Sequence, residues 1–391
     1  MKKTIAIGIV TICVIMSACT PPPGITEAPK IEPGVTPETS SPTLVETKPD
    51  VSSSPACYPV QFEASVTAKP VYLIYREKAL QMQIGDQTPQ PIGGLPDLGN
   101  IQNALIAGNS IILIRQNGIQ RIGPSDCSNV TISKFTEPIM MGDLLISPDG
   151  SRIYYGKVTY STRISEVGII ELDMEQVHLI QTLKDPEFTY SLIGITEDGK
   201  GLYYLQKGQD PSLGLILVIN IENGTTEKEL SFEGWSSVSL APNRRLAATP
   251  NQVVNKSSDP CCSLEYKLNV YDLASLPLTS PHVFTLPKTP GAIVGRLLWS
   301  PDSQTVYFLL LDSDYDPQIS YGLWSLNVTT GDARQVTAIP DKSYYLESIS
   351  PDGAWVTLRH DTPEQSLLVD LLTGNPHPFS VPYEAILAGW R

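Results

Sequence analysis

The sequence is poor in the groups that most enzymes use for catalysis. It has only four histidines in 391 residues, His178, His282, His360 and His377, and they are widely separated. No H-E-x-x-H helix motif and no G-x-S-x-G nucleophile elbow occurs. The first absence excludes the common zinc peptidase signature, and the second excludes the usual serine hydrolase elbow. We therefore expect no catalytic residues and a protein that is not an enzyme.

Positive charge and helical periodicity are also scarce. The 27 Lys and Arg residues are outnumbered by 41 Asp and Glu, which gives a formal net charge of −14. An acidic surface repels phosphate backbones, so nucleic acid is not an expected partner. Beyond the N-terminus, apolar residues do not recur every three or four positions. Short runs such as Ile111–Ile114 and Tyr307–Leu311 contain strand-forming residues. These features indicate an all-β protein.

One apolar run is conspicuous, and it lies at the N-terminus. Lys2 and Lys3 precede residues 5–15, a stretch with the length of a signal-peptide core and too short to cross a bilayer. Met16-Ser17-Ala18-Cys19 follows and resembles the bacterial lipobox, although Met16 replaces the usual Leu. The resemblance implies that residues 1–18 are a signal peptide and that Cys19 is lipidated. The alternative is an ordinary secretory peptide with an incidental cysteine.

The segment after Cys19 differs from the rest of the chain. Residues 19–55 are rich in Pro, Thr, Ser and Glu and have almost no large apolar side chains. Such a segment buries too little surface to offset the entropy lost on ordering, so we expect a disordered tether. Residues 56–391 then form the folded domain. The whole protein is expected at the extracytoplasmic face of a membrane or cell envelope, held there by its lipid.

Six cysteines are present, and four of them lie beyond the lipobox. An even number in an exported protein favours disulfides. We expect Cys57 to bond Cys127, which would fix the start of the domain to an early repeat. Cys261 and Cys262 are adjacent, so a bond between them would close a strained ring; free thiols or a soft metal pair are the alternatives.

A repeat runs through the folded domain. Its core is a Ser-Pro-Asp-Gly turn between two apolar strands, as in Ser147–Gly150 and Ser350–Gly353. Pro presets the first turn position, Asp bonds backbone amides, and Gly adopts the left-handed conformation that joins the strands. The Asp or Asn of the turn recurs at intervals of 49, 45, 59 and 50 residues, close to the size of one propeller blade, at positions 149, 198, 243, 302 and 352.

These units resemble the repeats of the periplasmic TolB family, also called PD40 or WD40-like repeats. The motif covers residues 146–353, and the architecture extends over about 66–391. The resemblance implies a single β-propeller and says little about function, because the same repeats occur in binding proteins and beside peptidase domains. A role in envelope assembly would follow only by analogy with TolB.

The strand rhythm predicts seven four-stranded blades. Six are expected near 101–135, 139–184, 188–231, 235–286, 293–339 and 343–381. The seventh combines three N-terminal strands, at 71–76, 80–84 and 89–92, with the last strand of the chain, Ala385–Trp390. This pairing would close the ring and remove both sheet edges. Six blades is the alternative.

Two motifs suggest ligands. Gly194–Lys200 fits the first seven positions of a phosphate-binding P-loop, but Gly201 stands where Ser or Thr is needed and a strand follows, so we reject it. Asp312, Asp314 and Asp316 alternate as calcium ligands do, although Pro317 stands where an EF-hand loop has Gly. Calcium is therefore the cofactor that the sequence suggests. The alternative is that these aspartates belong to a solvated loop that binds no metal.

Aromatic residues near the long loops are the candidate ligand-binding residues. Long loops on a rigid scaffold often carry recognition, and Tyr and Trp supply contact area. The candidates are Trp235, Tyr315, Tyr344 and Tyr345; packing between blades is the alternative role. We therefore expect a monomeric, membrane-tethered propeller that binds or scaffolds a protein, peptide or glycan. The alternative function is a propeller enzyme of the glycosidase or lyase type, acting in the central channel.

Overall fold

In the computed structural model, the regular elements of the described residues are strands, in seven antiparallel sheets of four. All of these residues belong to one compact unit, Ser53–Arg391. The structure describes residues 69–76, 79–92, 101–107, 110–123, 129–134, 139–159, 164–183, 189–207, 213–233, 238–254, 264–274, 280–286, 291–312, 322–340, 343–362, 365–382 and 384–390.

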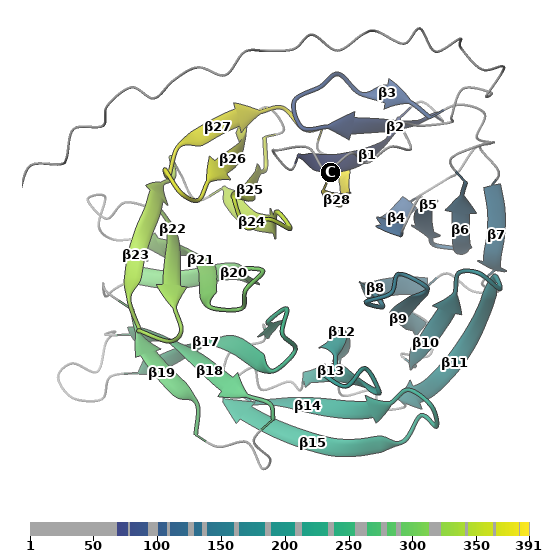
Figure 1. The fold of residues 1–391 in the computed structure, drawn as a ribbon, viewed down its shortest axis with the longest axis horizontal. Coiled ribbons are helices and arrows are strands. Elements are labelled where there is room, and N and C mark those ends of the chain that lie inside the picture. Colours follow the sequence, from purple (N-terminus) through teal and green to yellow (C-terminus); the bar gives the residue numbers. More distant parts are fainter. Residues whose placement is uncertain are drawn as a thin grey trace, which may run out of the picture. The chain divides into compact units, whose positions relative to one another are not determined.

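Each sheet is one blade, and the blades follow one another around a ring (Figure 1). The inner strands of successive blades contact each other from blade 1 to blade 7. Blade 1 contains β28 (Ile386–Trp390), β1 (Pro70–Arg76), β2 (Ala79–Ile84) and β3 (Gln90–Pro91). Blade 2 contains β4 (Ile101–Ala107), β5 (Ser110–Arg115), β6 (Gly118–Ile122) and β7 (Asn129–Lys134). Blade 3 contains β8 (Ile139–Ile146), β9 (Arg152–Thr159), β10 (Ser165–Glu171) and β11 (Gln176–Leu183).

The remaining four blades continue the same order. Blade 4 contains β12 (Thr189–Ile195), β13 (Gly201–Lys207), β14 (Leu213–Asn220) and β15 (Thr226–Glu233). Blade 5 contains β16 (Ser239–Leu240), β17 (Leu246–Val254), β18 (Leu264–Asp272) and β19 (His282–Thr285). Blade 6 contains β20 (Gly291–Trp299), β21 (Thr305–Asp312), β22 (Gly322–Asn327) and β23 (Ala333–Ala338). Blade 7 contains β24 (Tyr344–Ile349), β25 (Trp355–His360), β26 (Ser366–Asp370) and β27 (Pro376–Phe379).

The predicted ring closure is confirmed. The C-terminal strand β28 pairs antiparallel with β1, with Pro70 opposite Trp390 and Leu73 opposite Ile386. The six complete blades also fall close to the ranges expected from the sequence. Seven blades, and not six, therefore describe the fold, and the last strand supplies the innermost position of the first sheet. Closure of this kind leaves neither terminal strand as a free edge in the ring.

The core consists of apolar layers between adjacent blades. In β5, Ile111 and Leu113 face blade 1, whereas Ile112 and Ile114 face blade 3. Successive side chains of a strand point to opposite faces, so a strand covered on both faces must be apolar throughout. Each of the seven interfaces between neighbouring blades contains one such cluster of described residues. This explains why the sequence has continuous apolar runs rather than alternating ones.

Candidate functional site

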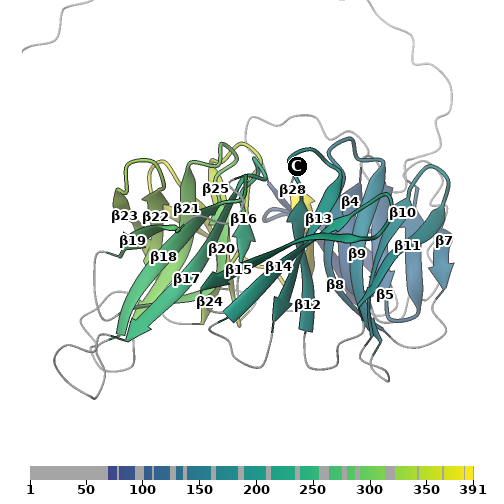
Figure 2. The same ribbon diagram turned by 90° about the horizontal axis from the view of Figure 1, so that it is seen from below.

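Two kinds of short turn lie along one edge of the propeller. The first joins the innermost strand of a blade to the next, and the second joins the third strand to the outermost one. Figure 2 shows both kinds along the upper edge, where β28 also ends. We call this edge the turn face. The first kind of turn contains the repeat motif recognised in the sequence.

The motif turns have the predicted chemistry. In blade 3, the Ser147 hydroxyl donates to Asp149 at 2.5 Å, and Asp149 also accepts from the backbone N–H of Ser151 at 3.1 Å. The Ser147 hydroxyl oxygen accepts from the N–H of Arg152 at 2.9 Å, which fixes the start of β9. Gly150 has φ of 72°, in the left-handed region. These hydrogen bonds lower the pKa of Asp149 to about 2, the one from Ser147 having the largest effect.

In two of the motif turns, the residue with the left-handed backbone conformation is not glycine. Gly199 and Gly353 adopt it as Gly150 does, but blade 5 has Arg244 there with φ of 60° and blade 6 has Ser303 with φ of 62°. A residue with a Cβ atom is strained in this region by roughly 1–2 kcal/mol. Arg244 therefore occupies a backbone position that favours glycine.

The second kind of turn has the same hydrogen-bonding pattern in three blades. In blades 4, 6 and 7 it begins with Asn220, Asn327 or Asp370, whose side chain accepts two backbone N–H groups, and it has glycine four residues later. A Cβ atom on Gly224 would lie 2.1 Å from the carbonyl oxygen of Ile180, on the blade before. The same atom on Gly374 would lie 2.3 Å from that of Val336. Glycine thus allows the turn to close against the preceding blade.

Blade 5 breaks this pattern. Its connection begins in the same way, with Asp272 accepting the N–H of Ala274 at 3.0 Å, but residues 275–279 lie outside the described part of the chain and glycine is absent four places after Asp272 in the sequence. Blade 3 also lacks this glycine and has Glu175 there, with φ of 54°. A cavity of about 370 Å³ lies between blades 4 and 5 at this point. We call it the blade 4/5 notch.

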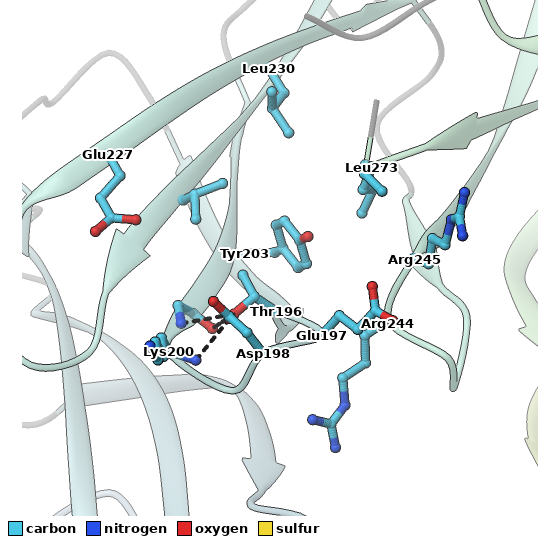
Figure 3. Close-up of a pocket in the computed structure, with 13 residues that line it drawn as sticks. Thr196, Glu197, Asp198, Lys200, Tyr203, Glu227, Leu230, Arg244, Arg245 and Leu273 are labelled. Atoms are coloured by element: carbon cyan, nitrogen blue, oxygen red, sulfur yellow. Dashed lines mark hydrogen bonds between the residues drawn. The ribbon is translucent and has the colours of Figure 1, made fainter. Parts of the chain in front are cut away.

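The floor of the notch is apolar and belongs to the layer between blades 4 and 5. Figure 3 shows Tyr203 at its centre with Leu230 and Leu273 nearby. Tyr203 is 6% exposed, and its hydroxyl makes no hydrogen bond within the described part of the chain. Burial, together with the charges of Asp198 and Glu197, raises the pKa of Tyr203. The phenol therefore keeps its proton and is a donor available to a ligand.

Charged side chains form the rim, and half of them are already engaged. Asp198 accepts from the Thr196 hydroxyl at 2.6 Å and from the N–H of Lys200 at 3.0 Å. Glu227 accepts from the Asn220 amide at 2.6 Å, and Arg245 pairs with Asp272 at 2.9 Å. The other three are Glu197, Lys200 and Arg244 (Figure 3). Among the described residues, none of these three side chains forms an ion pair or a hydrogen bond.

A second, smaller cavity of about 250 Å³ occupies the equivalent gap between blades 7 and 1. Trp355 contacts His377 edge to face there, with ring centroids 5.6 Å apart, and Phe379 and Leu368 are also part of the lining. Lys69 and Asp86 lie at the same cavity from the side of blade 1. The two cavities therefore flank turns at equivalent places in the repeat.

A buried polar cluster lies at the ring closure. Tyr72 of β1 donates to Glu347 of β24 at 2.6 Å, and Arg359 donates to the same carboxylate at 3.2 Å. The register of β24 slips between Leu346 and Ser348, so Glu347 is the bulged residue that reaches toward blade 1. Burial raises the pKa of Glu347. The pKa of Tyr72 is also raised, mainly by burial and to a smaller extent by the negative charge of Glu347.

This cluster has the chemistry of a structural contact. Tyr72 is 0% exposed, and its raised pKa keeps the phenol protonated, which is the opposite of what a catalytic base requires. Arg359 also donates to the carbonyl oxygens of Pro382 at 2.7 Å and Ala385 at 3.1 Å. Every partner is engaged in joining blade 7 to blade 1.

The candidate aromatic residues are only partly described. Tyr344 is 5% exposed, stacks edge-on against His360 with ring centroids 4.6 Å apart, and belongs to the apolar layer between blades 6 and 7. Tyr345 is 45% exposed and stays a candidate. Trp235 and Tyr315 lie outside the described residues. The notch was not foreseen, although aligning the repeats would have singled out Arg244.

The predictions on metals, disulfides and processing stay predictions. Asp312 ends β21, but Asp314 and Asp316 lie outside the described residues, as do Cys19, Cys57, Cys127, Cys261 and Cys262. Within the described ranges, no three His, Cys, Asp or Glu side chains gather in a way that could hold a metal ion. The same ranges contain no helix with the length and apolarity needed to cross a membrane.

Comparison with known proteins supports the fold. No protein-family model and no curated protein matches the chain. A functionally unknown protein from Desulfotomaculum acetoxidans DSM 771 is 13% identical with a TM-score of 0.53, over 82% of this chain and 98% of that one. An oligogalacturonate lyase in complex with manganese is 11% identical with a TM-score of 0.52, over 80% and 86%.

TolB is also among the solved structures that match. The protein from Acinetobacter baumannii is 16% identical with a TM-score of 0.41, over 68% of this chain and 62% of that one. The seven blades and their Ser-Pro-Asp-Gly turns confirm the TolB-like, PD40 type of propeller predicted from the sequence. At these identities the likeness concerns the fold alone.

Proposed function

We propose that the protein is a lipid-anchored, extracytoplasmic propeller that binds a protein, peptide or glycan at the blade 4/5 notch and does not catalyse a reaction. The observation that carries this proposal is the cavity of about 370 Å³ between blades 4 and 5, with its apolar floor around Tyr203 and its charged rim. An apolar floor with a few convergent polar groups is typical of a binding pocket. The motif turns of blades 4 and 5 at its rim are short and are held by the side chains of Asp198 and Asn243, so this part of the notch needs little ordering before it binds.

The anchor is proposed from the sequence. Cys19 would be the lipidated first residue of the mature protein, and residues 19–55 would hold the propeller away from the membrane. The proposed mature protein is a monomer. A rigid scaffold would benefit such a tethered receptor, because a preorganised site loses less conformational entropy when it binds its ligand.

Binding is favoured over catalysis by the state of Glu347, which is one of the two carboxylates, with Asp143, on the described innermost strands. Glu347 lies on the innermost strand of blade 7, where a channel-facing acid would be needed, and it is committed to Tyr72 and Arg359. A glycosidase or lyase in the channel would instead require carboxylates that reach a substrate. The enzyme alternative is therefore kept as an outcome of the experiment.

The experiment places a photo-crosslinking amino acid at the notch in living cells. p-Benzoylphenylalanine in place of Glu197 is expected to give one discrete adduct, identified by mass spectrometry, while the same probe in place of Asp173, on the turn face of blade 3, gives none. Cys19→Ser should release the protein from the membrane fraction. Equal adducts at both positions, or hydrolysis of a glycan panel by the purified protein, would overturn the proposal.

A further inference from the structure

Blade 3 has an arginine at a place where blade 4 has none. Arg152 begins β9 and lies opposite Glu171 of β10, and its Nε donates to the Glu171 carboxylate at 3.0 Å. Glu171 has the largest effect in raising the pKa of Arg152, and the Tyr154 hydroxyl contributes as well. A guanidinium of blade 3 is therefore held by one carboxylate and one tyrosine of the same blade.

Blade 4 keeps the tyrosine but not the arginine. Gly201 begins β13 as Arg152 begins β9, and Tyr203 follows two places later. Tyr203 is buried at the centre of the notch, and its hydroxyl has no hydrogen-bond partner within the described part of the chain (Figure 3). The Tyr203 hydroxyl thus lacks the guanidinium that its counterpart in blade 3 has.

A carboxylate is also present beside this place. Gly201 lies opposite Asn220 of β14, at the register position that Glu171 has in blade 3. The Asn220 amide donates to the Glu227 carboxylate at 2.6 Å. A neutral amide does not cancel the negative charge of Glu227, so this carboxylate can still bind a cation.

Two more acids make the floor of the notch electronegative. Glu197 and Asp198 line it together with Glu227, and the printed hydrogen bonds to Asp198 come from neutral donors. After burial, the charges of Asp198 and Glu197 are what raise the pKa of Tyr203. Their negative charge therefore acts at the Tyr203 hydroxyl.

The cations of the rim do not balance these acids at the floor. Arg245 pairs with Asp272 at 2.9 Å, and the Arg244 guanidinium points away from the floor (Figure 3). Of the described lining residues, Lys200 is then the remaining cation, against three carboxylates. A positively charged ligand would be attracted to this place.

The floor itself requires a ligand with an apolar part. Val218, Leu230 and Leu273 form an apolar surface with Tyr203. Arginine covers such a surface with its aliphatic stem while its charged end stays among polar groups. A metal ion would leave the floor uncovered.

We propose that the blade 4/5 notch recognises an arginine side chain of a peptide or protein partner, which takes the place that Arg152 takes in blade 3. The inference rests on the proposed binding function and names the ligand class of the same site. The guanidinium donates to Glu227 and to the Tyr203 hydroxyl oxygen. Its planar fork of five N–H donors can reach two acceptors at once.

The test measures binding of labelled, end-blocked peptides to the detergent-solubilised full chain by fluorescence anisotropy. One pool has Arg between Leu, Val or Phe residues, a matched pool has citrulline, which is similar in shape but uncharged, and a third has Lys. We expect the Arg pool to bind about tenfold more tightly than the citrulline pool, a typical effect of a charge-assisted pair. The Lys pool should bind more weakly than the Arg pool, because an ammonium is a compact point charge.

One pair of variants separates the notch from the acidity of the whole chain. Glu227→Gln removes a charge from the notch but keeps an acceptor for the Asn220 amide, so the preference for Arg should be lost while the fold is kept. Asp173→Asn removes the same charge from an exposed turn of blade 3 and should leave the preference unchanged.

A second pair fills the notch from within. Gly201→Arg supplies a guanidinium from the chain itself, as blade 3 does, and should abolish binding of the Arg pool. Gly201→Ala is the matched control, because both variants add a Cβ atom 2.9 Å from the Thr196 methyl group and only one adds the guanidinium. The alanine variant should keep the preference.

Three outcomes would overturn the inference: equal binding of the Arg and citrulline pools, an unchanged preference in Glu227→Gln, or undiminished binding in Gly201→Arg. Loss of the preference in Asp173→Asn as well would also contradict it, because the effect would then depend on overall charge. A Lys pool that binds as tightly as the Arg pool would contradict the choice of a guanidinium. If the peptides fail while the crosslink at position 197 is still obtained, the ligand class is wrong and the binding function stands.

Discussion

Tyr72 and Glu347 are separated by 275 residues in the chain, yet their side chains are joined by a hydrogen bond of 2.6 Å across the ring closure. Tyr72 belongs to the first strand and Glu347 to the seventh blade. The Trp390 indole adds a bond of 3.1 Å to Ser348, next to Glu347. The closure of the propeller is therefore made by polar contacts as well as by the pairing of β28 with β1.

Tyr72→Phe should destabilise the protein through this contact. The ring would still pack against Phe379, whose centroid lies 6.1 Å away, but the buried oxygen of Glu347 would lose its donor. An unsatisfied buried acceptor costs roughly 1–3 kcal/mol. The free energy of unfolding measured in urea should fall by about this amount.

Tyr203→Phe is the matched control for that experiment. It removes a hydroxyl from another buried tyrosine, but within the described residues this hydroxyl has no hydrogen-bond partner. Its free energy of unfolding should change by less than about 0.5 kcal/mol. Equal losses in the two variants would show that the Tyr72–Glu347 bond does not strengthen the ring.

The sequence predicted the blades because each is a local unit. The Ser-Pro-Asp-Gly turns, the apolar runs and the unpaired last strand lie within single blades or at the chain ends, and all three were interpreted correctly. The bulge that aims Glu347 at Tyr72 was not foreseen, since a one-residue slip of register leaves no composition signal. The notch was missed because a cavity depends on how closely two blades approach, which the turn motif does not specify.

The stability of the protein should depend on glycine where a turn of one blade lies directly against the preceding blade, because an added methyl group would overlap with that blade. Gly224→Ala and Gly374→Ala would each place a Cβ atom within 2.3 Å of a carbonyl oxygen on the preceding blade, at a left-handed φ. We expect each to reduce the free energy of unfolding by about 2–4 kcal/mol, from backbone strain together with the overlap.

Gly150→Ala and Gly199→Ala separate these two causes. Both glycines have a similar φ, but no atom lies within 4 Å of the added Cβ. Only the conformational cost remains, about 1 kcal/mol. Equilibrium unfolding of all four variants checks the difference, and four equal losses would show that close approach between blades is unimportant.

Acid should weaken the motif turns. The pKa of Asp149 is about 2, below its ordinary value of 3.8, so the folded state binds the proton less readily than the unfolded chain does. Such a group stabilises the fold above its unfolded pKa, and the contribution is lost as pH falls from about 4 to 2. The pKa values of Asp198 and Asp302, in two other motif turns, and of Asp272 and Asp370, which end the third strands of blades 5 and 7, are shifted in the same direction. The urea midpoint should therefore fall in this range.

Asp149→Asn identifies the contribution of one turn. The variant should reduce the slope of stability against pH between about 4 and 2, leaving the part due to the other four carboxyls. Glu347 has a raised pKa, so its contribution is present below its ordinary value of 4.5 and declines as pH rises through the folded value. A slope that is the same in wild type and Asp149→Asn would contradict the role given to this turn.

Arg244→Gly should stabilise the protein while removing a charge from the notch. Glycine suits the φ of 60° that Arg244 adopts, so the free energy of unfolding should rise by up to about 1 kcal/mol. Arg244→Ala removes the same guanidinium but keeps a Cβ atom at the strained position, and its stability should stay close to that of wild type. A gain seen with glycine and not with alanine would show that the wild-type protein retains a costly backbone conformation in order to keep an arginine at the notch.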